Sequence, residues 1–135
     1  MVDLQQSGEA DATVVVNGPT LAPNRTLWAV DEPGVMCWDG TDDKMFVAGT
    51  ARDNGSALFA IDCATDSVGP AIVLPERAAT LAWAGAGNRV CAGLSYVRLL
   101  SVVDAAAESL VATLALPNFP QALCYAEPHD RMYSF

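Results

Sequence analysis

The chain has 135 residues, of which 52% are hydrophobic and 17% are charged, and this composition supplies a core and excludes a disordered chain. Its 16 acidic and 7 basic side chains give a formal charge of -9, which repels phosphate backbones and anionic lipids, so neither nucleic acid nor a membrane is an expected partner. Apolar runs such as 97–103 are interrupted by polar residues and fall well short of the roughly 20 residues needed to cross a bilayer.

Residues 1–11 form a predicted N-terminal tail. They contain no basic residue and no apolar stretch, so this segment is not expected to act as a secretory signal as it stands. The sequence predicts no particular compartment.

Short strands are predicted along the rest of the chain, because Gly, Pro, Asn and Asp interrupt it every 8 to 12 residues or so. In chain order, the predicted strands are 13–17, 26–29, 33–38, 44–48, 57–62, 71–74, 78–83, 89–93, 99–104, 113–116, 120–125 and 131–135. Residues 105–116 have the composition of a helix, but the equivalent segment 63–74 contains Gly69-Pro70, which a helix interior does not accept. The sequence therefore predicts an all-β protein.

The predicted strands repeat at a fixed period. Trp38, Trp83 and Tyr125 each end an equivalent strand, and these aromatic residues are 45 and then 42 residues apart. This is the period of a β-propeller blade of four antiparallel strands, a to d. About three blades' worth is predicted, permuted as c-d, a-b-c-d, a-b-c-d and a-b. The repeat region, 12–135, accordingly divides into a half blade at 12–32, blades at 33–77 and 78–119, and a half blade at 120–135.

The two ends of this arrangement are complementary halves of one blade. Blades are apolar on both faces, so an open arc leaves two faces to be covered. We predict either a homo-oligomer that closes the ring, most simply two chains making six blades, or a segment of a longer propeller.

Two kinds of residue recur at fixed positions of the repeat. Asp62 and Asp104 end equivalent strands, and their carboxylates are predicted to accept backbone N–H groups of the following turn. Lys44, Arg89 and Arg131 open equivalent strands. They are predicted to keep charge beside the acidic a-b turn, and a repeated cationic binding ring is the alternative.

With the copies aligned, the pattern resembles the propeller repeats that have a Tyr-Val-Thr-Asn-like signature. The matching residues are Asp42-Asp43-Lys44-Met-Phe-Val-Ala48, Ala60-Ile61-Asp62 and Asp130-Arg-Met-Tyr133, while Ala82 departs from the Cys of the other copies. The resemblance implies a propeller fold. It does not select a function, since lactonases, quinohaem-dependent dehydrogenase subunits and surface-layer proteins share such propellers.

The d-to-a and b-to-c loops of a propeller lie on one face of the ring, where ligands commonly bind. The candidate ligand-binding residues on this loop face are Asp31, Glu32, Arg52, Asp53, Glu76, Arg77, Tyr96, Arg98 and Asn118. They differ from copy to copy, as a recognition surface does. The alternative is that they are simply solvated loop residues.

The residue types that most often carry chemistry give no motif. The four cysteines are 26, 28 and 33 residues apart, without metal-ligand spacing, and are predicted to be buried free thiols. The single histidine, His129, is predicted to be an exposed turn residue. The sequence thus predicts no catalytic residue, no metal ligand and no cofactor.

The expected function is a non-enzymatic binding or scaffold module that recognises a protein or a small ligand over its loop face. One alternative is a fragment of a lactonase-like, metal-dependent hydrolase with Glu or Asp side chains around a cation. Another is a structural repeat segment of a surface protein.

Overall fold

The computed structural model describes residues 13–20, 22–27, 30–51, 53 and 55–135. The predicted tail at 1–11 lies outside them. The strands are β1 (Thr13–Asn17), β2 (Ala22–Leu27), β3 (Met36–Asp39), β4 (Lys44–Thr50), β5 (Ser56–Asp62), β6 (Ile72–Val73), β7 (Ala78–Ala84), β8 (Arg89–Leu94), β9 (Leu99–Asp104), β10 (Ser109–Ala115), β11 (Leu123–Ala126) and β12 (Arg131–Ser134). Two short 3-10 helices, η1 (Gly85–Gly87) and η2 (Glu127–His129), complete the described elements, so the all-β prediction is confirmed.

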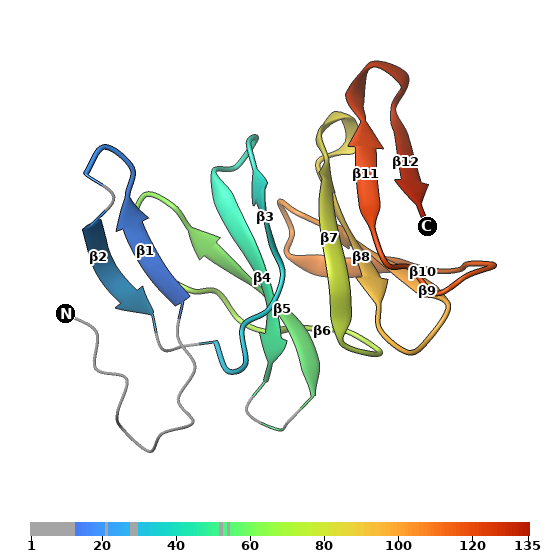
Figure 1. Cartoon of the computed structure of the whole chain (residues 1–135), viewed down its shortest axis with the longest axis horizontal. Helices are drawn as coiled ribbons and strands as arrows, with labels where there is room; N and C mark the ends of the chain where they lie inside the picture. The colour runs from blue at the N-terminus through green and yellow to red at the C-terminus, as the bar shows by residue number, and fades with distance from the viewer. Residues whose placement is uncertain (1–12, 21, 28–29, 52, 54) are drawn as a thin grey trace.

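The strands form two four-stranded and two two-stranded antiparallel sheets. Each four-stranded sheet runs in chain order, as β3-β4-β5-β6 and β7-β8-β9-β10, and the hairpins β1-β2 and β11-β12 flank them. Figure 1 shows the four sheets side by side in the order of the chain, with the N-terminal hairpin at one end and the C-terminal hairpin at the other.

The fourth strand of each sheet differs from its predicted bounds. β10 begins at Ser109, before the predicted 113, because Ser109 already pairs with Asp104 and a bulge follows between Leu110 and Ala112. β6 has only two residues, since Pro70 lacks the N–H group that a longer ladder needs. Of the predicted strand 26–29, residues 28–29 lie outside the described part of the chain.

Aspartates fix the turns between strands. Asp62 Oδ1 accepts a hydrogen bond from the Ala64 N–H at 2.8 Å, and Asp104 Oδ1 accepts one from the Ala107 N–H at 2.9 Å. The prediction that these two residues form turns is confirmed. The same geometry occurs earlier in the repeat at Asp39, whose Oδ1 accepts from the Thr41 N–H at 2.8 Å.

A second turn recurs between the first two strands of each sheet. Its last residue, Asp43, Asn88 or Asp130, has a left-handed backbone. In each turn that side chain accepts a hydrogen bond from the aromatic residue five positions earlier. The three bonds are Trp38 Nε1 to Asp43 Oδ1 at 3.0 Å, Trp83 Nε1 to Asn88 Oδ1 at 3.0 Å, and Tyr125 Oη to Asp130 Oδ1 at 2.7 Å. The recurring aromatic residues therefore hold the turn that follows them.

Two hydrophobic cores lie between neighbouring sheets. The larger core lies between the two four-stranded sheets and includes Phe46, Leu58, Val90 and Leu94, each 0% exposed. The smaller core lies between β3-β6 and the N-terminal hairpin, where Val15 packs against the cluster around Val47. Each four-stranded sheet is thus packed face to face against its neighbour.

Lys44 links the two four-stranded sheets. Its Nζ donates to the Ala105 carbonyl at 3.1 Å and lies 2.9 Å from Glu108 Oε1, both in the turn after β9. Arg89 instead lies 4.0 Å from Asp104 in its own sheet. For Lys44, the predicted partner, the acidic turn at the start of its own strand, is therefore replaced by a more distant turn that the facing sheet brings within reach.

Candidate functional site

Two of the predicted loop-face residues pair with each other. Glu32 Oε2 lies 3.6 Å from Arg77 Nη1, and Thr50 Oγ1 donates to Glu32 Oε1 at 3.4 Å. Glu32 has a left-handed backbone with φ 46°. The pair thus joins the loop before β3 to the loop before β7, but both side chains are about half exposed, so the ion pair adds little stability.

Other predicted site residues form hydrogen bonds or backbone bridges with nearby residues. Asp31 forms an isolated β-bridge with Thr50, Asp53 Oδ1 accepts from the Gly55 N–H at 3.1 Å, and Glu76 Oε1 accepts from the Arg77 N–H at 2.8 Å. Asn118 is exposed. Arg52 lies outside the described residues.

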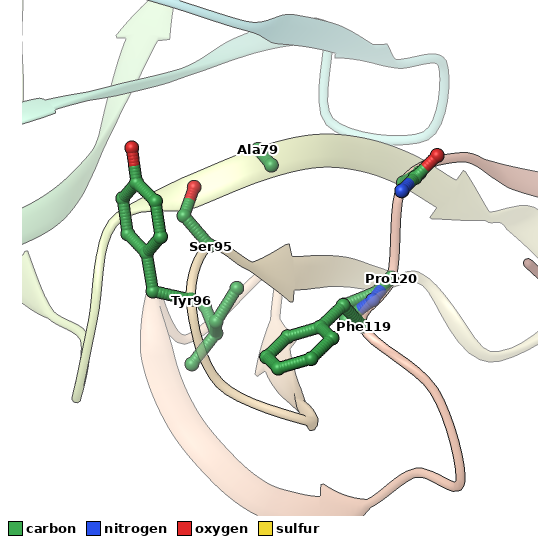
Figure 2. Close-up of a pocket in the computed structure, with 7 residues that line it drawn as sticks. Ala79, Ser95, Tyr96, Phe119 and Pro120 are labelled. Atoms are coloured by element: carbon green, nitrogen blue, oxygen red, sulfur yellow. The ribbon is translucent and has the colours of Figure 1, made fainter.

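A cavity of about 460 Å³ lies where the sheet β7-β10 meets the hairpin β11-β12. Its lining comes from the start of β7, the end of β8 and the loops that follow β8 and β10. The lining residues are Ala79, Leu94, Ser95, Tyr96, Phe119, Pro120 and Gln121. Figure 2 shows the Tyr96 ring on one side and Phe119 with Pro120 on the other, with Ser95 and Ala79 between them in this view.

The aromatic walls of this cavity are unusually placed. Tyr96 is 87% exposed and has a left-handed backbone with φ 61°, which is costly for a residue with a bulky side chain. Phe119 is 47% exposed, and the Arg98 guanidinium carbon lies 5.1 Å from the centroid of its ring. This is a cation–π contact that steadies the Phe119 ring and puts a positive charge beside the cavity.

Close packing fixes the far wall. A Cβ atom added to Gly93 would lie 2.7 Å from Thr80 Cγ2 and 2.8 Å from Pro120 Cβ. Only glycine lets Pro120 approach β8 so closely. The wall formed by Phe119 and Pro120 is therefore set by the sheet and not by the loop alone.

Two of the predicted loop-face residues lie at this cavity. Tyr96 and Arg98 were among the candidates, and Asn118 is the neighbour of Phe119. The predicted loop-face residues are polar or charged apart from Tyr96, so they do not include the apolar lining, above all Phe119 and Pro120. The available signal was a large apolar residue in a segment predicted to be a loop.

The single histidine was predicted to be an exposed turn residue. His129 ends η2 and is exposed, which confirms the exposed turn residue. Within the described ranges, no three His, Cys, Asp or Glu side chains gather as metal ligands. No helix among the described residues is long and apolar enough to span a bilayer.

All four cysteines are free thiols. The prediction that they are buried is confirmed for Cys91, holds only in part for the half-buried Cys37 and Cys63, and is wrong for Cys124, which is exposed. Cys37 occupies the equivalent position two repeats earlier and packs against the larger core, whereas no described sheet covers Cys124 on that side. Burial, Asp39 and the neighbouring Cys91 raise the pKa of the Cys37 thiol from 9.0 to about 12.

Thiol labelling tests this contrast. At pH 8, the pKa of Cys37 leaves it about a thousandfold less thiolate than an unperturbed cysteine, so iodoacetamide is expected to modify it only after unfolding, while Cys124 reacts first in the monomeric chain. Since the unfolded thiol ionises near pH 9 and the folded one near 12, the free energy of unfolding is expected to fall over that range. Mass spectrometry of peptides gives the rates. Equal labelling of both cysteines in the native monomer contradicts the buried environment of Cys37.

No family model matches the chain, and no curated protein matches it either. The resemblance to propeller repeats consequently remains a prediction.

Proposed function

We propose that the chain is a β-propeller segment that acts as a binding module, with the Tyr96–Phe119 cavity as its recognition site. The repeated four-stranded sheets, packed face to face in chain order, support the propeller assignment. β3 lies beside β7 and β7 beside β11, as the innermost strands of neighbouring blades do. On this assignment β1-β2 are strands c and d, and β11-β12 are strands a and b.

The observation that carries the binding function is the open aromatic cavity. An exposed tyrosine with a costly backbone conformation and a half-exposed phenylalanine add nothing to a core, but they provide flat apolar walls for a ligand. Arg98 supplies the adjacent charge. We infer that the ligand is a small molecule or peptide side chain with an aromatic or apolar body and a carboxylate near it.

N-acetyl-tryptophan is a suitable probe, since it combines an aromatic ring with a carboxylate. In a titration followed by ¹H–¹⁵N NMR, we expect the largest shifts at Ser95, Tyr96, Phe119 and Gln121. Replacing Tyr96 or Phe119 with alanine should weaken binding about tenfold, because a buried aromatic contact is typically worth more than about 1 kcal/mol. The amide of the probe, or Arg98→Gln in the protein, tests the contribution of the carboxylate.

Trp38→Ala is the matched control. Trp38 is also aromatic and 55% exposed, but it lies in β3 beside the turn to β4, at the opposite end of the strands from the cavity. This variant should bind the probe as the unchanged protein does. Shifts scattered over the surface, or equal loss of binding in all three alanine variants, contradict the assignment of the site.

A further inference from the structure

The strands β1 and β12 each have a free edge. Among the described residues, β1 pairs only with β2, and β12 pairs only with β11. The equivalent strands inside the chain have partners on both sides, since β4 pairs with β3 and β5, and β8 pairs with β7 and β9. The two hairpins are therefore halves of a sheet that the chain builds completely twice.

Side-chain exposure gives the same result. Phe46 is the third residue of β4 and is 0% exposed, whereas Tyr133, the third residue of β12, is 55% exposed. Phe135, two residues further on, is 76% exposed, but its counterpart Ala48 is 4% exposed. The apolar side chains that are buried in β4 are therefore exposed at the equivalent positions in and after β12.

We propose that β12 of one copy of this chain pairs with β1 of a second copy, forming a four-stranded sheet β11-β12-β1-β2 across the two chains. This goes beyond the proposed binding function: it rests on the propeller assignment made there but not on the binding site. The two copies exchange the contact reciprocally, as a two-fold dimer does. Since each copy has two complete sheets and two halves, the dimer contains six four-stranded sheets in a closed ring.

The internal repeats fix the register of the pairing. The basic residue that opens the second strand faces the aspartate that ends the third, as Lys44↔Asp62 and Arg89↔Asp104. The corresponding residues of the hairpins are Arg131 and Asn17, the last residue of β1. Counting from this pair places Tyr133 opposite Val15 of the second copy.

Backbone hydrogen bonds determine the type of this pair. Phe135 N donates to the Ala122 carbonyl at 3.2 Å, and Ala122 N donates to the Phe135 carbonyl at 2.9 Å, so the backbone groups of Phe135 point towards β11. Those of Tyr133, two residues earlier, point the same way. Tyr133 and Val15 of the second copy therefore form a pair without mutual hydrogen bonds, with Cα atoms about 4.5 Å apart.

The faces of the two hairpins agree with this register. Val15 packs against the smaller core of its own chain, as the equivalent Ala60 belongs to the larger core that β4 and β5 share with the next sheet. Tyr133 lies on the same face as Val15 in the composite sheet, and it is covered by the sheet β3-β6 of the second copy. The Tyr133 ring is then buried between two sheets, as the Phe46 ring already is.

Charges at the edge are also complementary. Lys44 contacts Glu108, which follows the turn aspartate of the next sheet by four residues and has a left-handed backbone. Arg131 is equivalent to Lys44, and the residue equivalent to Glu108 in the facing sheet is Asp66, whose backbone is also left-handed. The pairing brings Arg131 close to Asp66 of the second copy.

Cysteine cross-linking tests the register directly. Tyr133→Cys and Val15→Cys are made as separate proteins in a background with Cys63 and Cys124 replaced by serine. The Cα separation of about 4.5 Å lies within the range of a disulfide, so mixing the two proteins under mild oxidation should give a covalent dimer. Each protein alone should give none. Because β1 and β12 lie at opposite ends of the row of sheets, the bond joins two chains (Figure 1).

Met132→Cys mixed with Val15→Cys is the matched control. A shift of one residue moves the thiol to the other face of the sheet, so this mixture should give at least tenfold less dimer. Light scattering of the unmodified chain should give twice its mass of 14.1 kDa at micromolar concentration. A monomer up to hundreds of micromolar, a larger open polymer, or equal cross-linking in the control overturns the proposal. Probe binding at the Tyr96–Phe119 cavity is measured separately, so the two proposals fail independently.

Discussion

Replacing Phe46 with alanine is expected to lower the free energy of unfolding by about 3–5 kcal/mol. Phe46 is 0% exposed and lies in the core between the two four-stranded sheets, with Leu58 and Val90 in the same cluster. Its removal leaves a cavity at the sheet interface, because the surrounding strands are held by backbone ladders on both sides of β4 and cannot close around it. For a small domain, this is a large part of the total stability.

Urea unfolding followed by tryptophan fluorescence measures this effect, since Trp83 packs against the same core. Leu114→Ala is the control, because it also removes a large apolar side chain but Leu114 is 48% exposed on the outer strand β10. The control should change the free energy of unfolding by less than about 1 kcal/mol. If both variants lose the same stability, the two sheets do not pack through Phe46.

The strands and turns were predictable because their signals are local. Short apolar runs separated by turn residues predicted twelve strand regions. The recurrence of Asp62 and Asp104 at one position of the repeat predicted their hydrogen bonds to the following N–H groups. A turn carboxylate contacts atoms only two or three residues away, so its role is already present in the sequence.

Features that depend on distant residues were predicted less well. Lys44 reaches Glu108 and the Ala105 carbonyl, 61 residues away in the case of Ala105, because one sheet packs on the next. Cys37 and Cys124 occupy equivalent positions but differ in exposure, since the difference lies in the neighbouring sheet and not in the strand. Repetition in the sequence predicts the strands of each repeat, but it does not predict which neighbouring sheet packs against them.

The candidate site shows the same division. The exposed loop positions of Tyr96 and Arg98 followed from the repeat, but the Arg98 contact with Phe119 joins two loops that the pairing of β9 with β10 brings together. The approach of Pro120 to Gly93 likewise depends on a contact between segments that are far apart in the sequence. Loop polarity alone could not have selected the cavity from the other loop residues.

Gly49→Ala is expected to destabilise the protein by about 3 kcal/mol, at the upper end of the cost of overpacking a core. The added Cβ would lie 2.5 Å from Val30 Cγ1 and 2.8 Å from the Asp31 carbonyl oxygen. Val30 is 0% exposed and has no free space to move into, and the Asp31 oxygen belongs to the backbone. The segment that enters β3 therefore has to shift away from β4.

This shift has a second, local readout. Thr50 N donates to the Asp31 carbonyl at 2.8 Å, so faster hydrogen exchange at the Thr50 amide should accompany the loss of stability. Gly18→Ala is the control, since nothing lies within 4 Å of its added Cβ, and it should leave stability unchanged or raise it by up to about 1 kcal/mol through the unfolded chain. Gly49 lies within β4 and Gly18 in the turn after β1, and of the two only Gly49 faces atoms that an added Cβ would meet. If Gly49→Ala is as stable as Gly18→Ala, the Asp31 segment does not lie over β4, and the Glu32–Arg77 pair that depends on it is misplaced as well.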